Sequence, residues 1–130
     1  MVSILIVSHS QEIAQGTKEL AEQMKQGDIE IRAVGGTADG EIGTDPDAIE
    51  TAVNEINKSD GLLILADLGS AVMSVNMVLE WLDKEIREKI VLANAPIVEG
   101  AVIAAIEASM GNSMEDILNS IQSAEIIQKD

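Results

Sequence analysis

Continuous apolar runs alternate with segments of helical periodicity along this chain of 130 residues. Runs rich in Ile, Leu and Val are typical of strands that are buried on both faces of a sheet. They occupy residues 2–7, 29–34, 61–66 and 89–93. Each run is followed by a segment whose apolar side chains recur every three or four residues, which indicates a helix. This alternation predicts an α/β protein with a parallel sheet between two layers of helices.

The helices are expected where capping residues precede the periodic segments. Asp45 stands before Pro46, a pair typical of a helix start, and Ser113 opens the last periodic segment. The predicted helices cover residues 10–26, 46–56, 70–82, 98–109 and 113–124. Right-handed crossovers then give the strand order 2-1-3-4 in a single flavodoxin-like, three-layer domain over residues 1–130. A further short edge strand fits residues 125–128.

The switch point of this strand order lies between the first and third strands, where open α/β sheets bind their ligands. His9 follows the first apolar run by two residues, and Asp67 directly follows the third. The glycine-rich loop over residues 35–40 leaves the second strand at the same edge. We therefore expect an imidazole and a carboxylate to face one crevice.

His9 is the leading candidate for a nucleophile, because the chain has one His and no Cys or Tyr. Asp67 would fix the tautomer of the ring by accepting a hydrogen bond from one ring nitrogen. Helices that begin near Ser10 and at Gly69 would direct free N–H groups toward an anion beside His9. The predicted phosphoryl-binding residues are Ser8, Ser10, Gly36, Thr37, Gly69 and Ser70. Together these residues favour a phosphoryl group carried on His9.

Motifs and charge narrow the partners of such a site. No GxxxxGK[ST] or GxGxxG loop follows a strand, and no cluster of ligands has a recognised spacing, so we expect this chain to bind no nucleotide, cofactor or metal ion. The phosphoryl group would then arrive from one protein and leave to another. The net charge of -15 disfavours nucleic acid and anionic membrane surfaces and favours a basic protein partner, although acidity can also serve solubility alone.

Composition also bears on the core and on the location of the protein. An aromatic content of 1% requires an aliphatic core, in which we expect Met73 and Met77. We expect Trp81 to pack or to form an interface. The sequence contains no apolar run of about eighteen residues and no basic segment before its first apolar run, so we expect a cytoplasmic protein without a membrane span or a secretion signal.

Simpler structural roles compete with the phosphoryl-carrier interpretation. His9 could merely cap the first helix, and Asp67 could be the N-cap of the third. Ser8 and Gln11 have the spacing of a capping box. A two-component receiver domain shares the fold class, but it needs an acidic cluster after the first strand, where this chain has Ser8, His9 and Ser10.

Segments at the predicted strand ends resemble a known family. They are VSHS at 7–10, GGT at 35–37, ADLGSAVM at 66–73 and NAPIVEGA at 94–101. In that order they are similar to the DhaM family, the phosphotransferase subunits of the bacterial dihydroxyacetone kinase that uses phosphoenolpyruvate. The first domain of that family is similar to the mannose-type EIIA component of the sugar phosphotransferase system. The resemblance covers essentially the whole chain and implies a mannose-type EIIA-like phosphoryl carrier domain over residues 1–130.

The resemblance implies that His9 is phosphorylated and that Asp67 is the carboxylate beside it. It implies a relay from phosphoenolpyruvate through enzyme I and the carrier protein HPr to His9, and then to ADP held on the DhaL subunit, which phosphorylates dihydroxyacetone on the DhaK subunit. Some members carry additional HPr-like and enzyme I-like domains, whereas this sequence has 130 residues, so HPr is expected here as a separate protein. The resemblance also implies a homodimer, which suits Trp81 and the small residues Ala101, Ala104 and Ala105.

Two alternative functions stay open on the sequence. The chain could be the IIA component of a mannose-type sugar permease, which would differ in its acceptor and not in the chemistry of His9. It could also be a non-catalytic regulatory domain, in which His9 only caps a helix.

Overall fold

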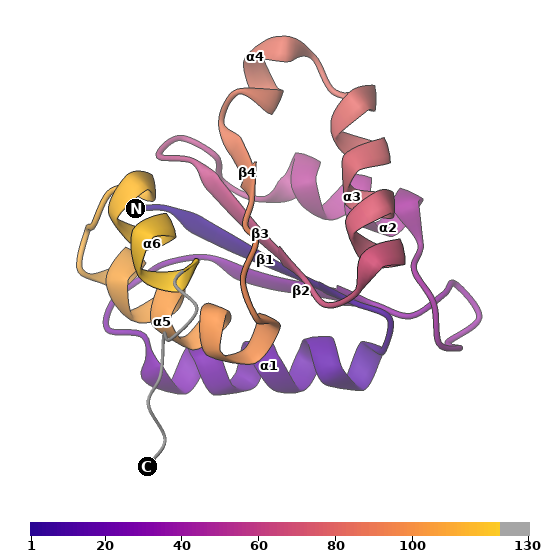
Figure 1. Cartoon of the computed structure of the whole chain (residues 1–130), viewed down its shortest axis with the longest axis horizontal. Coiled ribbons are helices and arrows are strands. Elements are labelled where there is room, and N and C mark those ends of the chain that lie inside the picture. The colour runs from indigo at the N-terminus through magenta and orange to yellow at the C-terminus, as the bar shows by residue number, and fades with distance from the viewer. Residues whose placement is uncertain (123–130) are drawn as a thin grey trace.

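The computed structural model describes residues 1–122 and is shown in Figure 1. Its elements are β1 (Ser3–Ser8), α1 (Gln11–Met24), β2 (Ile31–Gly35), α2 (Pro46–Glu55), β3 (Leu62–Ala66), α3 (Gly69–Trp81), α4 (Lys84–Arg87), β4 (Ile90–Leu92), α5 (Ile97–Ser109) and α6 (Met114–Ile121). The edge strand predicted at 125–128 lies outside the described residues.

The four strands form one parallel sheet in the order β2-β1-β3-β4, which confirms the predicted order. Helices α1, α5 and α6 lie on one side of the sheet, and α2 and α3 lie on the other (Figure 1). The predicted fold class, an α/β protein with a parallel sheet between two helical layers, is confirmed. The central pair is β1 and β3, in which Val7 lies opposite Ala66.

Each face of the sheet has its own hydrophobic core, because successive strand side chains point to opposite faces. In β1, Ile4 and Ile6 pack with α1, α5 and α6, while Leu5 and Val7 pack with α2 and α3. All four side chains are fully buried. At about 1.5 to 3 kcal/mol for each fully buried aliphatic side chain, β1 is a major source of stability and holds the residue that follows it rigidly.

Most of the predicted helix starts have a side-chain cap in the structure. Asp45 caps α2 ahead of Pro46, and the Ser113 hydroxyl accepts a hydrogen bond from the N–H of Asp116 at the start of α6. The N-cap of α1 is Ser10, whose hydroxyl accepts from Ile13, so the capping box considered for Ser8 is wrong. His9 does not occupy the N-cap position either.

Helix α3 starts without a side-chain cap. Its N-cap residue is Leu68, which cannot accept a hydrogen bond through its side chain. The N-cap role considered for Asp67 is therefore wrong, because the carboxylate lies one position earlier and is used elsewhere. The short helix α4 was not predicted, since its four residues are fewer than helical periodicity needs to be visible.

The methionines of α3 are not in the core. Met73 and Met77 are largely exposed, and the prediction that they are core residues is wrong. Helix α3 buries Ala71, Val75 and Val78 on its opposite face, so it is apolar on both sides. Trp81, at the end of the helix, is also exposed. None of the helices in residues 1–122 is both long and apolar enough to cross a bilayer.

Candidate functional site

The candidate site lies at the carboxyl edge of the sheet, between its two central strands. His9 comes directly after β1, and Asp67 comes directly after β3. The backbone N–H of Asp67 continues the ladder by donating to the carbonyl oxygen of Val7 at 3.2 Å. The pairing of β1 with β3 therefore places the two side chains face to face, as the strand order predicts.

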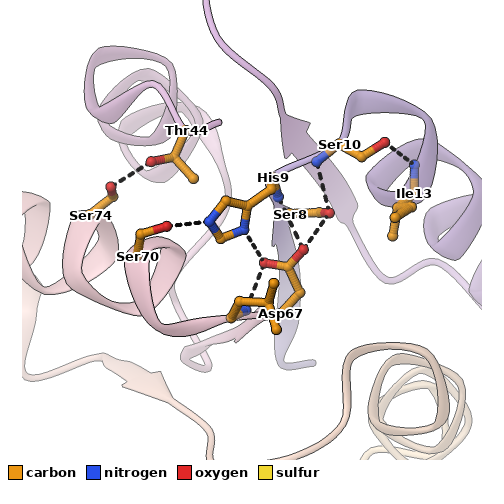
Figure 2. A network of polar contacts seen from close by, with 9 residues as sticks. Ser8, His9, Ser10, Ile13, Thr44, Asp67, Ser70 and Ser74 are labelled. Carbon is orange, nitrogen blue, oxygen red and sulfur yellow. Dashed lines mark hydrogen bonds and ion pairs between the residues drawn. The ribbon is translucent and has the colours of Figure 1, made fainter. Parts of the chain in front are cut away.

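The imidazole of His9 is held between two partners (Figure 2). Its Nδ1 lies 2.8 Å from Oδ1 of Asp67, and its Nε2 contacts the hydroxyl oxygen of Ser70 on α3. The side chains of His9 and Asp67 keep 19% and 14% of their surface exposed. Asp67 therefore fixes the ring through Nδ1, while Nε2 lies at the exposed rim of the site.

Both oxygens of Asp67 are fully engaged. Oδ2 accepts from the Ser8 hydroxyl at 2.7 Å and from the backbone N–H of His9 at 3.1 Å. Oδ1 accepts from the backbone N–H of Leu68 at 2.7 Å, in addition to the ring of His9. Partial burial raises the pKa of Asp67, but the hydrogen bonds from Ser8, His9 and Leu68 outweigh it and hold that pKa below its usual range. Asp67 is therefore ionised at neutral pH.

An ionised carboxylate can only accept hydrogen bonds, so the proton of a neutral His9 ring resides on Nδ1. The lone pair is then on Nε2, which faces Ser70 and the open rim. Because Ser70 is the only hydroxyl on this nitrogen within the described contacts, its O–H is the donor to Nε2 in the resting site. Of the two ring nitrogens, Nε2 is therefore the one with a lone pair available to a reactant, a point that the sequence left open.

Ser8 has a different position from the one predicted for it. Its side chain is fully buried, its hydroxyl donates to Asp67, and its oxygen accepts from the backbone N–H of Ser10 at 3.1 Å. The one hydroxyl proton is thus used inside the protein, and the predicted contact with a phosphoryl group is corrected to a contact with Asp67. Ser8 holds the carboxylate that holds His9.

Gly36 and Thr37 belong to the loop beside the site. The backbone N–H of Gly36 points to the carbonyl oxygen of Ser8 at 3.4 Å, and the Thr37 hydroxyl accepts from the N–H of Glu41. Gly36 has a φ of +78°, a left-handed conformation that favours glycine. These contacts shape the loop and do not bring either residue onto the ring of His9.

Two contacts that fasten this loop were not predicted from the sequence. The N–H of Gly43 donates to the carbonyl oxygen of His9 at 2.8 Å, and the hydroxyls of Thr44 and Ser74 are 2.7 Å apart (Figure 2). Ser74 lies one helical turn after Ser70 on α3. The four-residue spacing of Ser70 and Ser74 is the one signal in the sequence that both hydroxyls share a face of a helix.

The start of α3 is the part of the site that is best placed to receive an anion. No side chain in residues 1–122 caps this helix, and Ser70 in its first turn is exposed. A Cβ added at Gly69 would meet no atom within 4 Å, so the space in front of this turn is open. First-turn N–H groups and the positive end of the helix dipole favour an anion here. Among the described residues, no three His, Cys, Asp or Glu side chains form a group that could hold a metal ion.

Fold and site define a class: a parallel α/β domain with a histidine–carboxylate pair at the topological switch point of its sheet. Residues 3–118 match the model of the EIIA-man family, described as the PTS system fructose IIA component. The chain belongs to this family.

Named relatives of the chain come in two lengths. It is 39% identical over 121 residues to "PEP-dependent dihydroxyacetone kinase 2, phosphoryl donor subunit DhaM" of Listeria innocua, an alignment covering 93% of this chain and 97% of that protein. It is 40% identical over 129 residues to the phosphoryl donor subunit DhaM of Providencia stuartii, covering 95% of this chain and 27% of that longer protein.

A solved structure has the same fold. The crystal structure of a protein of unknown function, EF1359, aligns with a TM-score of 0.85 and 41% sequence identity. The alignment covers 93% of this chain and 92% of that one.

Proposed function

We propose that this chain carries a phosphoryl group on Nε2 of His9 within a phosphoenolpyruvate-dependent dihydroxyacetone kinase. It takes the group from phosphorylated HPr and passes it to ADP bound on the DhaL subunit, so that dihydroxyacetone on DhaK is phosphorylated. One observation carries the proposal: an ionised Asp67 occupies Nδ1 and leaves the lone pair of Nε2 at the open rim. The names of the relatives, which are phosphoryl donor subunits, support the same function.

The two transfer steps involve the phosphorylated nitrogen of the donor, Nε2 of His9 and the ADP held on DhaL. The lone pair of Nε2 attacks the phosphorus, a new N–P bond forms, and the N–P bond of the donor breaks with its electron pair returning to the donor nitrogen. The ring of His9 gains positive charge, which Asp67 stabilises through Nδ1–H. In the second step an oxygen of the terminal phosphate of ADP attacks the same phosphorus, and the electron pair of the N–P bond returns to Nε2.

The phosphoryl oxygens are held by neutral groups of α3. The Ser70 hydroxyl turns from Nε2 to a phosphoryl oxygen once the N–P bond forms, since Nε2 then has no lone pair to accept its proton. The N–H groups of the first turn, with the helix dipole, complete the cradle. In this proposal the nucleotide stays on DhaL, and the chain works in the cytoplasm together with HPr and DhaL.

Reconstitution tests the proposal. The chain is incubated with phosphoenolpyruvate, enzyme I and HPr, and intact mass spectrometry should show one added phosphoryl group that is labile in acid. His9→Ala should fold and gain no mass. Adding DhaL with ADP to the phosphorylated chain should form ATP. A phosphoryl group on the His9→Ala variant, or none on the wild type, would overturn the assignment.

The description of the matching family model favours a second acceptor, because it names a fructose IIA component. In that case the phosphoryl group would pass to the IIB component of a sugar permease. Offering DhaL with ADP and a sugar permease IIB to the same phosphorylated chain separates the two functions by which acceptor removes the label. If the chain were a non-catalytic regulatory domain, His9 would not be labelled, and neither acceptor would have a phosphoryl group to remove.

We propose further that the chain is a homodimer, as the resemblance to the family implies. Light scattering at micromolar concentration should report twice the chain mass of 13.8 kDa. A monomer at that concentration would contradict the proposal.

A further inference from the structure

An exposed apolar stripe runs along α3 from the candidate site. Met73, Met77 and Trp81 are 70%, 46% and 49% exposed, and they follow one another at intervals of four residues. Ser70 shares their face of the helix, since the four positions fall within an arc of about 80° at 3.6 residues per turn. The stripe, defined as Met73, Met77 and Trp81, therefore begins one turn from the residue that contacts Nε2 of His9.

The composition of the stripe is that of an interface and not of ordinary surface. Trp and Met are enriched where proteins meet, and Trp81 is the only Trp of the chain. The opposite face of α3 is already buried, with Ala71, Val75 and Val78 fully covered. The stripe is thus not part of the core, and most of its apolar surface is not buried against other described residues.

Charge is distributed unevenly around the site. The segments that build this edge of the molecule, residues 8–15, 35–47 and 67–73, contain no Lys or Arg. Their acidic residues are Glu12, Asp39, Glu41, Asp45, Asp47 and Asp67. Most basic residues of the chain lie instead toward the opposite edge of the sheet, where the chain enters the strands: Lys25, Lys58, Lys84, Arg87 and Lys89 in the connections, and Arg32 near the start of β2.

This distribution sets a requirement on the protein that delivers the phosphoryl group. The group is an anion, and the described residues around His9 offer it hydroxyl and N–H dipoles without a cation. Stabilising the charge in transfer therefore falls to basic side chains of the donor, which an acidic rim attracts. We propose that the stripe is the docking surface for this phosphoryl donor, a protein whose reactive group is surrounded by apolar and basic side chains.

The inference rests on the proposed function, and it specifies how that function recognises its partner. The donor must bring its phosphoryl group to Nε2, so it must cover Ser70 and the first turn of α3. From Ser70 the stripe extends about 17 Å at 1.5 Å per residue, a span suited to a helix or strand of the partner. Flexible methionine side chains fit surfaces that must adapt to a partner and release it.

Paired lysine substitutions test the docking surface. Met73→Lys/Met77→Lys removes apolar contact and opposes a basic partner, while both positions are exposed and lysine is a good helix former. The matched control is Leu20→Lys/Met24→Lys, an equally spaced pair on α1 whose side chains are each 45% exposed. Both variants change the net charge equally. Met73→Leu/Met77→Leu keeps the stripe apolar.

Two rates are measured for each variant. The first is kcat/KM for phosphorylation of His9 by phosphorylated HPr, and the second is the rate of labelling by phosphoramidate, a small phosphoryl donor that needs no docking. We expect the α3 pair to lose at least about tenfold in kcat/KM, a loss typical of truncating interface anchors, while the α1 pair and the leucine pair lose less than about twofold. Phosphoramidate labelling should be equal in all variants. Equal kcat/KM values for the two lysine pairs would overturn the inference.

A binding measurement separates this inference from the proposed function. In ¹⁵N-labelled His9→Ala, which cannot accept the group, the single indole N–H resonance of Trp81 should shift when unphosphorylated HPr is added. If it shifts while the wild type takes no phosphoryl group, the proposed function fails and the docking surface stands. If the wild type is phosphorylated while the indole resonance stays in place, the docking surface fails and the proposed function stands.

Discussion

Replacing Asp67 with asparagine should slow phosphoryl transfer without unfolding the protein. The substitution removes the charge opposite the ring and leaves an amide of the same shape. Each carboxylate oxygen accepts a backbone N–H, from Leu68 at 2.7 Å on Oδ1 and from His9 at 3.1 Å on Oδ2. Whichever way the amide is turned, its NH₂ group therefore meets a backbone donor. Leaving one such donor without an acceptor costs about 1 to 3 kcal/mol of unfolding free energy, with the lower end expected at this part-buried position.

The effect on the rate follows from the lost charge. With about 4 Å between the charge on the ring and the carboxylate, their attraction is about 1 kcal/mol at the dielectric constant of water and about 4 kcal/mol at an effective value of 20. The His9 and Asp67 side chains are 19% and 14% exposed, so the site lies between these limits. The expected loss is roughly tenfold to a thousandfold in transfer rate. The amide orientation that faces NH₂ toward Nδ1 would also move the ring proton to Nε2 and block the nucleophile.

Rapid-quench transfer from phosphorylated HPr measures this loss. Asp45→Asn is the control, because asparagine caps a helix as well as aspartate does and the variant removes one negative charge at the start of α2, where the side chain contacts only the backbone of that helix. It should transfer at the wild-type rate. A folded Asp67→Asn variant with an unchanged rate would refute the role of the carboxylate and leave Asp67 as a purely structural acceptor.

Three further outcomes are expected. Ser8→Ala should raise the pKa of Asp67 toward its usual range, measured by ¹³C NMR of the carboxyl group, because the Ser8 hydroxyl bond to Oδ2 helps to lower it; an unchanged pKa would refute this. Gly35→Ala should lower the unfolding free energy by more than about 2 kcal/mol, because a Cβ there would lie 2.8 Å from the Cα of Gln11. Gly69→Ala should change the unfolding free energy by less than about 1 kcal/mol, because a Cβ there meets no atom within 4 Å. Similar denaturation midpoints for the two variants would contradict this difference. The difference in unfolding free energy between wild type and Asp67→Asn should be largest above the pKa of Asp67 in the unfolded chain, about 4, and should shrink as pH falls through the lower pKa of Asp67 in the folded state. A difference that grows in acid would contradict this direction.

The sequence predicted the fold because its strands are continuous apolar runs with no competing interpretation. Pro46 after Asp45 and Ser113 before an acidic turn located two helix starts, since capping chemistry is local. The juxtaposition of His9 with Asp67 followed from the strand order alone. What could be predicted was therefore whatever depends on chain periodicity or on the ends of adjacent parallel strands.

The remaining features depend on how side chains meet across the fold. Ser8 and Ser10 have the same chemistry and both follow the apolar run, but only the structure shows that one is fully buried against Asp67 while the other caps α1. Met73 and Met77 lie on a helix that is apolar on both faces, so periodicity could not say which face is buried. The Thr44–Ser74 contact joins segments with no shared pattern.

The reactive nitrogen exists as such only after residues 59 positions apart have been paired, because Ser8 at the end of β1 and Asp67 after β3 must come together before the ring is oriented. A chain in which β3 has not yet joined β1 would have an ordinary, freely rotating imidazole. Phosphorylation of His9, as proposed above, would thus depend on completed folding, and a newly made or damaged copy would accept few phosphoryl groups. As denaturant rises, loss of phosphoryl labelling at His9 should accordingly coincide with loss of the sheet. The phosphorylated fraction would then report how much of the protein is correctly folded.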